Sequence, residues 1–154
     1  MARDGATSSR VLDVPAAAVA MVLSDPRTFD GVVVGSRRIR WFDPRWPEVG
    51  SRFHHTMGIG PLSVRDHTEV VADELPDRLL LAVHVRPLGS AEVEFRVTPE
   101  ASGARVDITE TPTSGVLAAI WSPPLAALTR RRNDTVLARL EKVARQRART
   151  AALA

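Results

Sequence analysis

The stretch AEVEFRVT, Ala91–Thr98, decides the fold because apolar and polar residues alternate through it without a break. Successive side chains of a β-strand point to opposite faces, so Ala91, Val93, Phe95 and Val97 share one face. The other face carries two glutamates, an arginine and a threonine. This pattern is typical of an antiparallel sheet that packs against a core on one side only.

The same alternation recurs on both sides of this stretch. Further strands are expected at Arg38–Phe42, Arg52–Met57, Val64–Val71, Leu79–Arg86 and Arg105–Thr111. Turn signals rich in glycine and proline separate the strands, at Pro47–Gly50, Gly58–Pro61, Pro76–Asp77, Pro87–Gly89 and Glu100–Gly103. Connections this short join antiparallel neighbours, so the sequence predicts an antiparallel meander.

Helical segments are expected on either side of the meander. A short strand at Arg10–Val14 leads to Pro15, a residue favoured at the first position of a helix, and to a short helix at Ala16–Leu23. A second short helical or irregular piece is expected at Arg27–Val34. Residues 125–147 place their apolar side chains on one stripe of a long helix, which should cover the apolar face of the sheet.

Composition limits the possible function classes. The chain has 154 residues, of which 44% are hydrophobic and 25% charged, which suits one buried core and argues against a disordered chain. No run approaches the ~20 apolar residues of a membrane-spanning helix, and the N-terminus lacks a secretory pattern, so we expect a cytoplasmic protein. The absence of cysteine excludes disulfides, thiolate catalysis and thiolate metal sites.

Positive charge is concentrated at the C-terminal end. From Thr129 onward, eight basic residues accompany two acidic ones, a net charge of +6, whereas the preceding 128 residues carry −3. A solvated helix face explains this better than nucleic-acid binding, because no aromatic residues are interleaved with the arginines. Docking of the basic helix to an acidic partner is a further alternative, and the sequence leaves the oligomeric state open.

Five short motifs carry a resemblance to a known family through their order along the chain. They are Val14-Pro15-Ala16, Leu23–Pro26, Gly58–Leu62, Asp77–Leu81 and Arg105–Glu110. In this order the chain is similar to the helix-grip fold of the START and pollen-allergen superfamily, and specifically to the bacterial SRPBCC group, often labelled polyketide cyclase/dehydrase. The resemblance implies an α+β fold in which a curved antiparallel sheet of about seven strands wraps around the long C-terminal helix, with two short helices after the first strand.

The expected division of the chain follows from this resemblance. It predicts a flexible tail at residues 1–9, a single domain at 10–148 and a second flexible tail at 149–154. It also implies a cavity between sheet and helix that holds an apolar small molecule, neutral or anionic, without a cofactor. The expected lining residues are Trp41, Phe53, His55, Met57, Val64, Asp66, Thr68, Leu81, Val83, Phe95, Ile108, Glu110, Leu128, Arg132 and Val136.

A polar minority on the inward face suggests acid–base chemistry. His55, Asp66, Thr68 and Glu110 fall among the apolar positions, and hairpin pairing places His55 opposite or diagonal to Asp66. Such a couple could transfer protons, because a carboxylate raises the pKa of a nearby histidine. The alternative is a satisfied structural pair, because a buried carboxylate is costly unless it is paired.

Arg132 lies within the apolar stripe of the long helix, unlike the two arginines before it. A guanidinium pointing into the cavity could anchor a carboxylate or an enolate. It could equally pair with Glu110 or Asp66, or extend to solvent at the end of the cavity.

Three histidines fall on the outward face of neighbouring strands. His54, His67 and His84 could bring three imidazoles to a zinc ion. A solvated histidine patch is the favoured interpretation, because outward side chains diverge and no partners that would orient the rings are evident.

Three functional hypotheses remain from the sequence. The first is a protein that binds an apolar ligand such as a polyketide-like molecule, a quinone or a lipid. The second is a cyclase- or aromatase-like enzyme in which His55, with Asp66 or Glu110, moves protons. The third is an interaction module that uses the basic last helix. The resemblance carries over no catalytic residue, because members of the superfamily share none.

Overall fold

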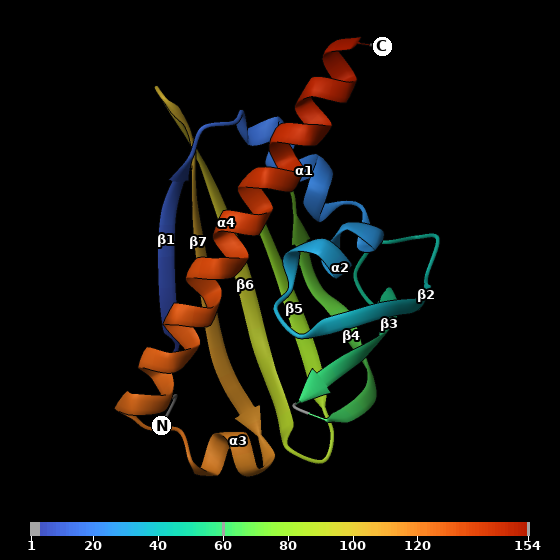
Figure 1. Ribbon diagram of the computed structural model, residues 1–154, viewed down its shortest axis with the longest axis vertical. Helices are drawn as coiled ribbons and strands as arrows, with labels where there is room; N and C mark the ends of the chain where they lie inside the picture. Colours follow the sequence, from blue (N-terminus) through green and yellow to red (C-terminus); the bar gives the residue numbers. More distant parts are fainter. Residues whose placement is uncertain (1–3, 60, 154) are drawn as a thin grey trace.

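Seven antiparallel strands form one sheet in residues 4–59 and 61–153, which the computed structural model describes. The strand order is β1-β7-β6-β5-β4-β3-β2, and α4 lies diagonally across one face (Figure 1). The predicted α+β helix-grip fold is therefore confirmed. The strands are β1 (Ala6–Leu12), β2 (Ser36–Phe42), β3 (Arg52–Ile59), β4 (Leu62–Glu74), β5 (Arg78–Val85), β6 (Gly89–Glu100) and β7 (Gly103–Ser114).

Helices connect the first two strands and follow the last one. They are α1 (Ala16–Leu23), the 3-10 turn η1 (Pro26–Thr28), α2 (Phe29–Val32), α3 (Gly115–Ala119) and α4 (Pro123–Leu153). The predicted helix at Ala16–Leu23 is confirmed with the same bounds. Pro15 is the residue before this helix rather than its first residue, and it has an extended backbone. No described helix is long and apolar enough to cross a membrane.

Several elements have bounds that differ from the predicted ones, most clearly at the two ends of the chain. β1 begins at Ala6 instead of Arg10, because residues 6–9, expected in a tail, pair with β7 from Ala6 opposite Glu110 onward. At the other end, α4 continues to Leu153 through most of the expected C-terminal tail. Residues 1–3 of the first tail, Gly60 of the Gly58–Leu62 hairpin and residue 154 lie outside the described residues.

β2 departs from the predicted alternation. Its pairing with β3 shifts register between Ile39 and Trp41. A shift of one residue reverses the faces of the side chains that follow. Trp41, expected to face inward, is therefore 53% exposed, while its neighbour Phe42, expected to face outward, packs against the core.

The closely packed core lies at one end of the sheet. Leu137, Leu140 and Ala144 of α4 are fully buried there, together with Leu12 and Val106 of the sheet. Figure 1 shows α1 beside α4 at this end, whereas α3 and the β5–β6 hairpin lie at the opposite end. The space under the sheet is therefore closely packed at the end beside α1. The opposite end is the one where α3 and α4 begin.

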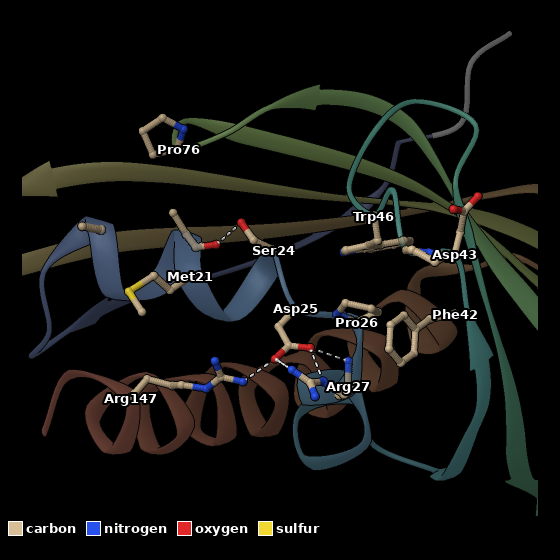
Figure 2. Close-up of a pocket in the computed structure, with 13 residues that line it drawn as sticks. Met21, Ser24, Asp25, Pro26, Arg27, Phe42, Asp43, Trp46, Pro76 and Arg147 are labelled. Carbon is tan, nitrogen blue, oxygen red and sulfur yellow. Dashed lines mark hydrogen bonds and ion pairs between the residues drawn. The ribbon is translucent and has the colours of Figure 1, made fainter. Parts of the chain in front are cut away.

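An ion-pair cluster ties α4 to the turn after α1. The Asp25 carboxylate accepts hydrogen bonds from the backbone N–H and Nε of Arg27, both at 3.0 Å, and from Nη2 of Arg147 at 2.5 Å. Figure 2 shows the three residues in an open depression beside Met21 and Trp46. Burial raises the pKa of Asp25, but the bonds from Arg27 and Arg147 outweigh it and lower this pKa to about 2.

The Asp25→Asn variant should be less stable than the wild type at pH 7 by about 1–2 kcal/mol. Because the folded pKa of Asp25 lies below its ordinary value of 3.8, this stabilisation is present above that value and is lost as the pH falls through about 2. Urea unfolding at pH 7 and at decreasing pH measures the difference. Asp43→Asn, at a carboxylate whose partner among the described residues is nearby Arg45, is the control and should change little. A gap between wild type and Asp25→Asn that is constant with pH would contradict this account.

Candidate functional site

A cavity of about 440 Å³ lies between the sheet and the first turns of α4. Its walls come from α2, β3 to β7, α3 and α4, and apolar side chains form most of its surface. The depression of Figure 2 is more open, and its Asp25 carboxylate is already paired with arginine. The cavity is therefore the candidate functional site.

Twelve of the fifteen residues expected at the cavity line it in the structure. They are Phe53, His55, Met57, Thr68, Leu81, Val83, Phe95, Ile108, Glu110, Leu128, Arg132 and Val136. The three that do not line it are Trp41, Val64 and Asp66. Trp41 is turned outward by the register shift in β2. Val64 lies near the tip of the β3–β4 hairpin. The buried Asp66 carboxylate accepts a hydrogen bond from the backbone of the β5–β6 turn.

Several lining residues were not predicted from the sequence. They lie in α2 and the segment after it, in the β5–β6 turn, in α3 and on α4: Phe29, Val33, Val34, Leu88, Leu117 and Asn133. The run Val32-Val33-Val34 was the one available signal for the first group, because three adjacent valines before a glycine suit a buried segment. Asn133 gave no signal, since one polar residue on a charged helix is ordinary.

His55 lies on the cavity wall and is buried, with 3% of its surface exposed. The backbone of His55 pairs with that of Asp66 between β3 and β4, as predicted. In the described part of the chain, the His55 ring forms no hydrogen bond with the Asp66 carboxylate. The Nε2 atom is instead 3.1 Å from the hydroxyl of Thr68. Burial lowers the pKa of His55, and nearby Asp66 opposes this only in part, so the imidazole is neutral at pH 7.

Asp66 holds the β5–β6 turn to β4. Its carboxylate accepts hydrogen bonds from the backbone N–H groups of His67 at 2.9 Å and Arg86 at 2.8 Å, and Nε of Arg86 lies 3.3 Å away. Burial raises the pKa of Asp66, but these donors outweigh burial and lower it. Of the two interpretations of His55 and Asp66, these contacts favour a structural role for the Asp66 carboxylate.

A polar cluster stands on the opposite wall of the cavity. Arg132 of α4 points to the cavity, and its Nη2 donates to Oε2 of Glu110 on β7. Nδ2 of Asn133 donates to the same oxygen at 3.3 Å, and Oδ1 of Asn133 accepts from Arg132, also at 3.3 Å. Of the alternatives for Arg132, the pairing with Glu110 is the one that the structure contains.

The outward histidines stack on one another. The rings of His67 and His84 are 4.4 Å apart and 30° from parallel, and His54 lies 5.7 Å from His67. Stacked imidazoles direct their lone pairs side by side instead of toward a common point, as a tetrahedral zinc site would need. Within the described residues, no three histidine, aspartate or glutamate side chains are placed so that they could hold a metal ion.

Comparisons with known proteins show what this architecture is similar to. No family model and no curated protein matches the chain. Among solved structures, protein NE0264 from Nitrosomonas europaea is 17% identical with a TM-score of 0.66, and the match covers 93% of this chain and 95% of that one. Protein CV1439 from Chromobacterium violaceum is 16% identical with a TM-score of 0.70, covering 92% and 97%.

A third similar structure has a descriptive name. The di-domain ARO/CYC protein StfQ, from the steffimycin biosynthetic pathway, is 13% identical with a TM-score of 0.70. The match covers 92% of this chain and 50% of StfQ. At these identities the likeness shows the shared helix-grip fold, which confirms the architecture implied by the sequence resemblance.

Replacing Asp66 by alanine should destabilise the fold by about 1–3 kcal/mol, because two backbone N–H groups would lose their buried acceptor. Urea unfolding at pH 7 measures the loss. Asp107→Ala is the control, since in the described part of the chain Asp107 accepts bonds from exposed side chains and from no backbone group, and its loss should stay below about 1 kcal/mol. Equal losses in the two variants would show that Asp66 does not anchor the turn.

Proposed function

We propose that this protein binds an apolar small molecule in the cavity between its sheet and α4. The observation that carries this proposal is the cavity itself, about 440 Å³ in volume and lined mainly by apolar side chains. Small-molecule sites have volumes of roughly 300–1,000 Å³ and combine apolar walls with a few polar groups. The polar groups here are His55 with Thr68 on one wall, and Glu110 with Arg132 and Asn133 on another.

The residues around the hollow support a ligand-binding role. Protein interiors are normally packed as densely as organic crystals, with few voids larger than a water molecule. On β5 and β6, the wall includes the smaller side chains of Val83, Ala91 and Val93. Val83 and Val93 remain partly accessible although they face inward. Apolar surface kept accessible in this way is stabilised when an apolar ligand covers it.

The finer identity of the ligand is also part of the proposal. A polyketide-like molecule, a quinone or a lipid would each supply an apolar body for these walls. StfQ, which has a similar structure, is a di-domain ARO/CYC protein from the steffimycin biosynthetic pathway. This likeness favours the polyketide-like class among the three. Fold likeness alone does not select a ligand, so binding experiments must do so.

An enzymatic role is the second candidate, and His55 is the observation that favours it. It is a neutral imidazole on the cavity wall, held by the hydroxyl of Thr68. A neutral imidazole can accept a proton from a bound poly-carbonyl chain. Glu110 supplies the carboxylate of the described cavity wall, and Arg132 could steady an enolate through the same cluster.

The Val93→Phe variant should bind an apolar ligand about tenfold more weakly, because the larger ring occupies ligand volume. Fluorescence titration with the neutral dye N-phenyl-1-naphthylamine measures the affinity. Leu80→Phe, on the outward face of β5, is the matched control and should leave the affinity unchanged. If the wild type does not bind the dye, or both variants bind as the wild type does, the cavity is not the site.

The His55→Gln variant distinguishes an enzyme from a binding protein. Glutamine retains hydrogen bonding but does not titrate, so cyclisation of a poly-carbonyl substrate should slow by ~10² to 10⁴ while dye affinity changes little. His67→Gln, on the outward face, serves as the control. Full turnover in the His55→Gln variant would remove the proton-transfer role and leave the binding role.

A further inference from the structure

We propose that the cavity selects an uncharged apolar molecule with a hydroxyl group that donates a hydrogen bond to Glu110. This inference rests on the proposed binding function and narrows the class of ligand. It follows from two features of the cavity wall, namely how its charges are paired and which hydrogen-bonding atoms remain accessible.

The charges on the described cavity wall cancel. Its ionisable side chains are His55, Glu110 and Arg132. The Arg132 guanidinium is joined to the Glu110 carboxylate, and buried His55 is neutral. A carboxylate ligand would lose its hydration and be repelled by the Glu110 carboxylate. The positive charge of Arg132 would compensate little for this, because it is already paired with Glu110. An ammonium ligand would meet Arg132 in the same way.

The hydrogen-bonding capacity of Glu110 is only partly used. Arg132 and Asn133 both donate to its Oε2 atom. Within the described residues, the Oε1 atom of Glu110 has no hydrogen-bond partner. It is not fully buried, so a ligand group can reach it. An ionised carboxylate only accepts hydrogen bonds. A ligand group beside Oε1 must therefore donate, which a hydroxyl does and an ether does not.

The surroundings of Glu110 favour an apolar ligand body next to the hydroxyl. Val93 pairs with Glu110 across the sheet, and Leu81 pairs with Val93 in turn. On the facing helix, Leu128 and Val136 also line the cavity. A second polar group beside the hydroxyl would lie against these side chains without a partner, which is unfavourable.

The test uses three probes that share one ring system. They are 2-naphthol, 2-methoxynaphthalene and 2-naphthoate, each titrated at pH 7 against bound N-phenyl-1-naphthylamine. The wild type should bind 2-naphthol roughly tenfold more tightly than the ether, because the ether cannot donate to a charged acceptor. It should also bind 2-naphthol at least about tenfold more tightly than 2-naphthoate, because Glu110 repels the anion.

The Glu110→Gln variant should reverse part of this order. The neutral amide leaves the Arg132 charge without its partner, so 2-naphthoate should gain affinity by about tenfold while the preference for 2-naphthol over the ether falls. Glu92→Gln is the same substitution on the outward face of β6 and should leave all three affinities unchanged.

The outcomes separate this inference from the proposed function. If the wild type does not bind the dye, the proposed function fails. If the dye binds but 2-naphthol has no advantage over the ether, or if 2-naphthoate binds best, the hydroxyl inference is overturned. Should Glu110→Gln fail to fold, as judged by circular dichroism, the three affinities of the wild type still decide between these results.

Discussion

The packing of α4 against one end of the sheet is the constraint on which the rest of the structure depends. Leu137, Leu140 and Ala144 are fully buried there, and the Arg147 ion pair with Asp25 fastens the same part of α4 to the turn after α1. Because the helix is rigid, this attachment also determines where its first turns lie. Those turns lie over β1 and β7, and the cavity is the space between them and the rest of the sheet.

The polar residues under the sheet divide into a structural group and a group that a ligand can reach. The Asp66 carboxylate accepts hydrogen bonds from backbone N–H groups of β4 and of the β5–β6 turn, and so joins this turn to β4. Glu110 lines the cavity together with its partner Arg132, whereas His55, bonded to Thr68, is buried in the cavity wall. This division matters for function, because a carboxylate that satisfies backbone N–H groups cannot also exchange protons freely with a ligand.

The pairing of charges in the cavity shapes the kind of molecule that the protein can accept. An arginine alone in an apolar pocket would favour an anion, whereas the same arginine joined to a carboxylate leaves the pocket neutral. The structural neighbours share the fold at identities below 20%, so side chains at the cavity wall, and not the fold, must determine the ligand.

The sequence by itself determined the strands, their antiparallel order and the long covering helix, because these depend on local periodicity and short turns. Alternation through Ala91–Thr98 and the connection at Pro76-Asp77 are examples, since each involves neighbours along the chain. Most inward residues of the cavity wall followed from the same periodicity. The exposed Trp41 did not, because the register shift that turns it outward arises from pairing between β2 and β3.

Only the tertiary structure decided which polar groups meet. The sequence left Arg132 with several partners, and the choice of Glu110 depends on how α4 crosses β7. Asp66 has His55 opposite it on β3, yet its carboxylate turns to Arg86, twenty residues further along the chain. Hydrogen-bond partners are selected by side-chain rotamers and by the divergence of strands, and neither follows from a pattern of apolar and polar residues.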